Sequence, residues 1–135
     1  ILKKYEQDKN GDVQAALTDI YAHSGNDDNY DFMVTALQEA TGYSKYLVVQ
    51  NFQSYLALCK PETIQKGSEA MVAFGKTSSK LVKTQTVNSL TLLKKDINTK
   101  LKEYGDKAEY FADVSKLRKT TEYIDQSLSE LKNKN

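Results

Sequence analysis

The feature that most constrains this chain is a heptad pattern near its C-terminal end. Seven residues alternate spacings of four and three there: Tyr110, Val114, Leu117, Thr121, Ile124, Leu128 and Leu131. This spacing places all of these side chains on one stripe of an α-helix. The segment 106–131 is therefore expected to be a single long helix that buries the stripe against another helix.

The partner of this stripe is expected directly upstream in the chain. Residues 78–104 contain a second apolar series: Val87, Leu90, Leu93, Ile97, Leu101 and Tyr104. Gly105-Asp106 separates the two segments, and so short a connection makes neighbouring helices antiparallel. Asp106 and Glu109 also resemble the capping box that begins many helices. These features predict a helical hairpin with arms at 78–104 and 106–131.

The stretch from residue 62 to residue 104 is compatible with one helix or with two. Four of its apolar residues are out of phase with the later series: Met71, Phe74, Leu81 and Val82. A break or a change of packing neighbour is therefore expected near Thr84-Gln85-Thr86. Gly67 and Gly75 weaken the helix further upstream, because Gly costs up to about 1 kcal/mol against Ala in a helix interior.

Two shorter helices are expected near the N-terminus. Residues 12–23 place apolar side chains at spacings of three and four, and Asp12 is the expected N-cap. The same pattern resumes at residue 30 and continues to Thr41-Gly42, where a glycine can end a helix. Between these helices, residues 24–29 consist of turn-forming residues and predict a loop.

A buried middle helix is expected at residues 44–60, because its apolar residues fall around the whole helix circumference. A β-strand at Tyr46 to Val49 is the competing interpretation, although no equally strong partner strand is present. Pro61 suits the first turn of the next helix.

The content of glycine and proline supports a helical fold. The 135 residues include only six Gly and one Pro, against an average of about twelve per cent for the two together. We therefore expect an all-α fold, an up-and-down bundle of about five helices that ends in the long antiparallel hairpin. Residues 1–135 are expected to form a single domain, with fraying at residues 1–11 and 132–135.

Composition also bears on compartment and partners. Because Cys59 is the single cysteine, this chain cannot form an internal disulfide framework or a multi-cysteine zinc site. That slightly favours the cytoplasm, while secretion after processing stays open. No apolar run approaches the roughly 18 residues of a transmembrane segment. Arg118 is the only arginine, and nucleic-acid binding is therefore not expected.

The charges are distributed unevenly along the chain. Residues 1–77 carry 7 Lys and 10 Asp or Glu, a net charge of −3, whereas residues 78–135 carry 11 Lys, 1 Arg and 8 Asp or Glu, a net charge of +4. The basic half coincides with the predicted hairpin. A solvated lysine face is its simplest interpretation.

Few residues are suited to catalysis. His23 is the only histidine, and its place near a helix C-terminus suits an interaction with the helix dipole rather than a catalytic triad. Cys59 lies on an apolar helix, where a free cysteine usually behaves as a small buried hydrophobe. The chain is therefore expected to be neither an enzyme nor the holder of a cofactor.

Two acidic segments, Asp8 to Asp12 and Asp27 to Asp31, each read Asp-x-Asn-x-Asp, which is how a calcium loop opens. Val13 and Phe32 occupy the place of the turn glycine, and Asp19 and Gln38 replace the bidentate glutamate. Turn formation and helix capping explain both segments without a metal. No metal site is therefore predicted, and calcium binding stays an open alternative.

Two sets of side chains are candidates for binding. An aromatic set could surround an apolar or aromatic ligand inside the bundle: Phe32, Tyr43, Tyr46, Phe52 and Tyr55. A basic set lies beside the apolar series of the long helix and could face anionic lipid or an acidic partner: Lys76, Lys80, Lys94, Lys95 and Lys102.

These features favour a non-enzymatic interaction or scaffold module that presents its amphipathic hairpin to a protein partner. Two alternatives remain. The first is a carrier for a small apolar or aromatic molecule, held by the aromatic set. The second is a hairpin that binds the surface of anionic membranes through the basic set.

Overall fold

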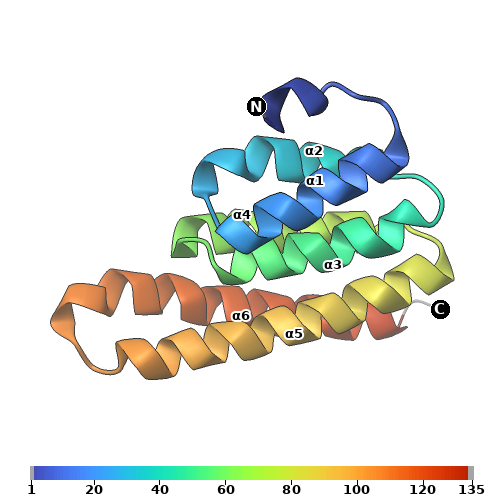
Figure 1. Cartoon of the computed structure of the whole chain (residues 1–135). Helices are drawn as coiled ribbons and strands as arrows, with labels where there is room; N and C mark the ends of the chain where they lie inside the picture. The colour runs from blue at the N-terminus through green and yellow to red at the C-terminus, as the bar shows by residue number, and fades with distance from the viewer. Residues whose placement is uncertain (1, 134–135) are drawn as a thin grey trace.

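The computed structural model describes residues 2–133 and contains six α-helices in that range (Figure 1). The helices are α1 (Gly11–Ser24), α2 (Tyr30–Glu39), α3 (Ser44–Ala57), α4 (Pro61–Lys76), α5 (Lys80–Tyr104) and α6 (Phe111–Asn133). Short 3₁₀ turns lie at Leu2–Tyr5 (η1), Asp27–Asn29 (η2) and Ala108–Tyr110 (η3). No strand occurs within residues 2–133, so the all-α prediction is confirmed and the strand alternative for Tyr46 to Val49 is wrong.

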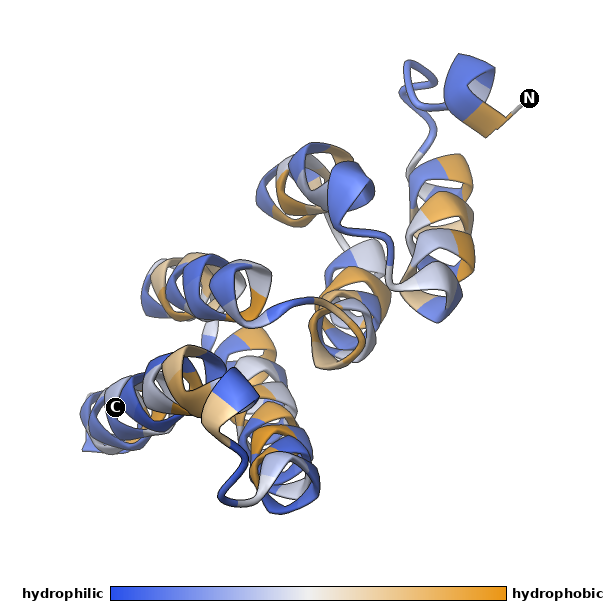
Figure 2. Cartoon of the chain, turned by 90° about the vertical axis from the view of Figure 1, so that its left-hand side faces the viewer, coloured by the Kyte–Doolittle hydropathy of each residue, from blue (hydrophilic) through white to orange (hydrophobic). Residues whose placement is uncertain are grey.

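The helices run up and down as three successive hairpins, α1–α2, α3–α4 and α5–α6. Figure 2 shows these hairpins stacked in two layers, with α1, α3 and α5 in one layer and α2, α4 and α6 in the other. Within the layers α1 packs on α3, α3 on α5, and α4 on α6. Such stacking of helix pairs is the arrangement of α-solenoids.

The core lies between the two layers and extends through all three hairpins. Its largest fully buried side chains are Tyr55, Phe52, Met33, Leu37, Leu56, Ile64, Met71, Leu90, Leu93, Ile97, Leu117 and Ile124. Complete burial of one such side chain contributes roughly 1.5–3 kcal/mol. The middle hairpin is covered on both sides, which explains why α3 is apolar around most of its circumference.

The C-terminal hairpin is present, but its second arm begins later than the sequence suggests. α6 starts at Phe111, after η3, and neither Asp106 nor Glu109 makes a capping hydrogen bond. The capping-box prediction is therefore wrong. Gly105, at φ 58°, ends α5 in the left-handed region, and the longer connection allows Tyr110 to stack on Tyr104 with ring centroids 4.6 Å apart.

The heptad stripe of α6 lies where its pattern predicts. Its last three apolar residues and Leu117 are buried, while Tyr110, Val114 and Thr121 are half-buried. Thr120 and Ser127 are buried as well. Their burial beside the stripe follows because α6 packs on α4 in addition to α5, a second neighbour that a two-helix hairpin does not require.

Residues 62–104 form two helices, separated at residues 77–79. The predicted break near Thr84 to Thr86 is wrong, since α5 runs through these residues without interruption. Of the earlier series, Met71 and Phe74 belong to α4, whereas Leu81 and Val82 belong to α5 together with the later series. Leu81, assigned to the earlier series, is 70% exposed.

Three local predictions for the N-terminal hairpin need correction. The N-cap of α1 is Asn10 rather than Asp12, because the Asn10 side chain accepts hydrogen bonds from the backbone N–H groups of Asp12 and Val13. Ile20 is exposed because α1 lies at the edge of its layer. α2 ends at Glu39, and Gly42 lies in the turn into α3 rather than at the helix cap.

The chain ends for which fraying was predicted are ordered in part. The N-terminal segment is held by Gln14, whose side-chain amide donates to the Asp8 carbonyl at 2.5 Å, and by the Tyr21 hydroxyl, which donates to Glu6 at 2.6 Å. α6 continues to Asn133. Residues 1, 134 and 135 lie outside the described range.

Candidate functional site

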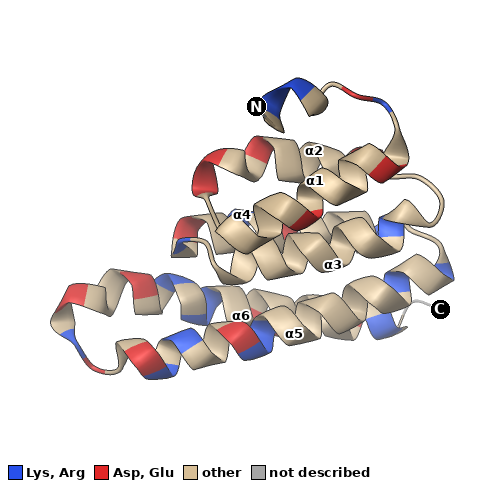
Figure 3. Ribbon diagram, in the orientation of Figure 1, with Lys and Arg blue, Asp and Glu red and all other residues tan. Residues whose placement is uncertain are grey.

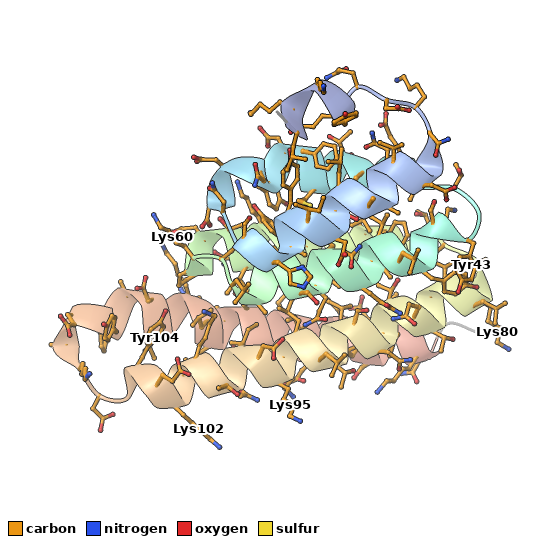
Figure 4. The ribbon with its side chains drawn as sticks, viewed as in Figure 1. Tyr43, Lys60, Lys80, Lys95, Lys102 and Tyr104 are labelled. Atoms are coloured by element: carbon orange, nitrogen blue, oxygen red, sulfur yellow. The ribbon has the colours of Figure 1, made fainter. Side chains whose placement is uncertain are left out.

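The five residues of the aromatic set lie in several separate places. Phe52 and Tyr55 are completely buried in the core. Phe32 packs edge-on against a ring of α1, with centroids 5.3 Å apart. Tyr43 is 77% exposed and contacts Tyr46 at the start of α3 (Figure 4). The fold therefore does not gather these aromatics around a common ligand.

Tyr55 and Cys59 connect the first hairpin to the second. The Tyr55 hydroxyl donates to the Asn26 carbonyl at 2.6 Å, and the Cys59 thiol donates to the Gly25 carbonyl at 3.8 Å and to the Tyr55 carbonyl at 3.2 Å. Burial raises the pKa of the Tyr55 hydroxyl and raises that of the Cys59 thiol to about 11. Because a thiolate is the reactive form of cysteine, Cys59 is poorly suited to nucleophilic catalysis.

Residues of both acidic segments cap helices. In addition to the Asn10 cap of α1, the Asp27 carboxylate accepts from the backbone N–H of Lys60 at 3.1 Å and from the Thr63 hydroxyl at the start of α4. Within residues 2–133 no group of three or more His, Cys, Asp or Glu side chains is arranged to hold a metal ion. The segments are thus accounted for by capping and turn formation.

A cavity of about 660 Å³ lies between the N-terminal segment, α1, α2 and the start of α3. It is lined by four carboxylates and one lysine: Glu6, Asp8, Asp31, Glu39 and Lys9. Phe32 is the only member of the aromatic set that reaches it. This acidic lining is a poor match for the apolar ligand that the carrier hypothesis requires.

The lysines of the basic set do not form one continuous surface. Lys76 pairs with Glu130 at 3.7 Å, and Lys94 pairs with Asp125 at 2.5 Å. Lys80 lies at one end of α5 and Lys102 near the other, with Lys95 between them (Figure 4). These positions leave the positive charge dispersed along the helix and partly neutralised.

A more concentrated group of exposed apolar side chains lies on the layer of α1, α3 and α5. Exposed leucines gather there: Leu47 at 42%, Leu58 at 57%, Leu81 at 70% and Leu92 at 52%. Leu81 and Leu92 are three helical turns apart and therefore share one side of α5. Among the described residues, α2 and α4 expose no large apolar side chain. We call this surface, defined by the four leucines and the neighbouring residues of α1, the α1/α3/α5 face.

The charge of the α1/α3/α5 face changes from negative at α1, through nearly neutral at α3, to positive at α5. Residues 10–44, which include α1, contain six Asp or Glu and no Lys or Arg. Residues 46–59 of α3 and its C-terminal turn contain no charged side chain, whereas α5 contains six Lys and two acidic residues. Figure 3 accordingly shows α3 almost without charge between an acidic α1 and a lysine-rich α5.

A groove of about 300 Å³ crosses this face. Its lining comes from α1, from α3 with its C-terminal turn, and from α5: Asp19, Ala22, His23, Asn51, Gln53, Ser54, Ala57, Leu58 and Asp96. Sequence reasoning did not assemble this set, since its members lie up to 77 positions apart in the chain. In the sequence, the only sign of this groove is the uncharged segment at residues 46–59.

The Asp96 carboxylate of the groove is positioned by a local contact. The side-chain amide of Gln53, which is only 8% exposed, donates to Asp96 at 2.8 Å. Burial raises the pKa of Asp96, although the Gln53 hydrogen bond and the nearby Lys100 and Lys95 act in the opposite direction. On α1, His23 Nδ1 lies 2.8 Å from the Asp19 carbonyl, in keeping with a role at the helix end.

Two further findings bear on interpretation. No helix within residues 2–133 combines the length and the apolar character needed to cross a bilayer. Comparisons with protein-family models, with curated proteins and with solved structures found no match for this chain. A functional proposal therefore depends on the physical character of the surface.

Proposed function

We propose that this chain is a non-enzymatic protein-interaction module that binds an amphipathic helix along its α1/α3/α5 face. The observation that carries this proposal is the concentration of exposed aliphatic side chains around the uncharged α3. Helices commonly dock with their apolar side chains at spacings of three, four and seven residues on such a surface. The C-terminal hairpin contributes through Leu81 and Leu92 of α5.

The energetic basis is burial of the exposed leucines. Leu47, Leu58 and Leu92 are each about half covered already, so covering the rest contributes roughly 1 kcal/mol per side chain, about half the value for complete burial. Several such contacts are needed, because association itself costs free energy. A partner helix that covers only one leucine is not expected to bind.

The alternatives find less support. The carrier hypothesis requires the aromatic set to surround one ligand, but these side chains lie in separate places. The cavity of about 660 Å³ near the N-terminal segment has an acidic lining. Binding to anionic membranes is opposed by the pairing of Lys76 and Lys94 with carboxylates. For an enzymatic function, the single cysteine is poorly placed as a nucleophile, since the Cys59 thiol is buried and bonded to backbone oxygens.

A display selection of random helical peptides on the complete chain tests the proposal. We expect enriched peptides to carry an apolar stripe and to bind the double variant Leu47→Gln, Leu58→Gln about thirtyfold more weakly, because two leucine contacts of about 1 kcal/mol each are lost. Phe111→Gln is the matched control, since it removes an exposed apolar side chain at the hairpin tip, away from α3. Circular dichroism checks that the variants are folded.

Two outcomes would contradict the proposed function. One is enrichment of peptides that bind the Leu47→Gln, Leu58→Gln variant as tightly as the original chain. The other is a selection that yields no peptide with an apolar stripe.

A further inference from the structure

The groove of the α1/α3/α5 face differs chemically from the leucines around it. Asp19 of α1 and Asp96 of α5 line it from opposite sides, and α3 runs between them. The two carboxylates belong to different hairpins, so their convergence is a product of the stacking. Lys95, the nearest lysine in sequence to Asp96, extends away from α3 (Figure 4).

Two polar side chains of α3 that line the groove already have their amide nitrogens engaged in hydrogen bonds. The Asn51 amide nitrogen donates to the Thr18 hydroxyl at 3.0 Å. The Gln53 amide nitrogen is likewise engaged with Asp96. Each amide therefore has its oxygen left to accept a hydrogen bond, and the hydroxyl of Ser54 can accept another. The groove is thus richer in acceptors than in donors.

Apart from His23, the remaining lining is aliphatic. Ala22, Ala57 and Leu58 contribute apolar surface to the same groove. Long basic side chains place their methylene stems on such surface while the charged group meets polar partners. The volume of about 300 Å³ lies at the lower end of ligand pockets, so one long side chain is a better match than a separate large molecule.

Other occupants are disfavoured by the same groups. An apolar side chain in the groove would cover Asp96 without supplying a donor, and a buried unpaired charge is costly. An acidic side chain would meet two carboxylates. His23 Nδ1 lies 3.8 Å from the Asp19 carboxylate. Lys100 and Lys95 act electrostatically on Asp96, and among the described ion pairs none includes Asp96.

From this geometry we infer that the groove binds a lysine or arginine side chain within the apolar stripe of the partner helix. The inference rests on the proposed function and adds the chemistry of the partner to it. The leucines of the α1/α3/α5 face supply the apolar contact area, and the carboxylates select the register in which a basic residue meets the groove.

Amide-detected NMR titration of the complete chain with two small probes tests this inference. n-Butylguanidinium reproduces the end of an arginine side chain, and n-butylurea is its uncharged counterpart of similar shape. We expect n-butylguanidinium to shift the amides of Ser54, Ala57 and Leu58 with higher affinity than n-butylurea. In Asp96→Asn the affinity for n-butylguanidinium should fall about fivefold, as for a partly exposed ion pair of about 1 kcal/mol.

Asp125→Asn is the matched control, since Asp125 pairs with Lys94 between α5 and α6 and does not line the groove. Equal affinities for the two probes, or an unchanged affinity in Asp96→Asn, would overturn the basic-residue inference. So would shifts confined to the acidic cavity near Glu6. None of these results requires a substitution at Leu47 or Leu58, so the peptide selection remains a separate test of helix docking.

Discussion

Individual polar residues in this protein connect one hairpin to the next. The segment 24–29, recognisable from its composition as a loop, supplies Asp27 to the start of α4 and the Asn26 carbonyl to the Tyr55 hydroxyl. Gly25, at φ 59°, lies so close to Leu58 that an added Cβ would be 2.4 Å from the Leu58 Cβ. The loop therefore fixes how the first hairpin lies on the second.

Gly67 provides a quantitative test at the scale of one residue. It lies inside α4, and an added Cβ would be 2.3 Å from Leu56 Cδ2. Gly67→Ala gains up to about 1 kcal/mol of helix propensity but overpacks the core, which typically costs about 1–3 kcal/mol. We expect a net decrease in the free energy of unfolding, measured by urea denaturation.

The Leu56→Ala background is the control for this prediction. Without the Leu56 methyl groups, the same Gly67→Ala change should raise the free energy of unfolding, because only the gain in propensity remains. A decrease of equal size in both backgrounds would show that the contact with Leu56 is not the cause.

At the scale of elements, the C-terminal hairpin is defined by burial rather than by surface charge. The stripe of α6 meets α5, while Thr120 and Ser127 lie on a second buried side toward α4. The exposed ion pair between Lys116 and Glu62, with N and O atoms 3.0 Å apart, also joins α6 to α4. Such exposed pairs contribute little, so the apolar stripe supplies most of the stabilisation.

Leu117→Asp tests the importance of this stripe. Leu117 is fully buried, and replacing it with a carboxylate places an unpaired charge among apolar neighbours. We expect a loss of several kcal/mol, seen as a large decrease in the thermal midpoint or as failure to fold. Ser115→Asp, at an exposed position of the same helix, should leave the midpoint nearly unchanged. A similar thermal midpoint for both variants would argue against the burial of Leu117 in the apolar stripe of α6.

At the scale of the whole molecule, the three hairpins differ in length. α5 and α6 are longer than the other helices, and their connecting end extends beyond α3 and α4 (Figure 1). At this tip Tyr104 stacks on Tyr110, and Phe111 is 77% exposed. The tip is therefore stabilised mainly by its own contacts.

This difference predicts a gradient of hydrogen exchange along α5. Backbone amides of residues 101–104 should exchange at least about tenfold faster than those of residues 90–97, because the latter lie in a segment packed on neighbouring helices. Tyr104→Ala should increase the exchange of the tip and leave residues 90–97 unaffected. Uniform protection along α5 would contradict the described packing.

The sequence by itself determined the helices and the antiparallel C-terminal hairpin. Periodicity reveals which side of each helix is apolar, and turn-forming residues reveal where the chain reverses. The residues that fill the centre, such as Phe52 and Leu117, were therefore identifiable in advance. Local signals were less reliable at the boundaries, as the misassigned caps at Asp12 and Asp106 illustrate, because any Asp near a turn satisfies the capping pattern.

Only the tertiary structure decided how the hairpins stack and which surface stays open. Leu47 and Leu58 follow the apolar pattern of buried residues, yet they are exposed because no other helix within residues 2–133 covers the α1/α3/α5 face. The groove has the same origin, since Asp19 and Asp96 approach one another only when α1, α3 and α5 lie in one layer. The periodicity of the sequence shows on which side of its own helix a residue lies. Which other helix packs against that side depends on contacts between residues far apart in the chain.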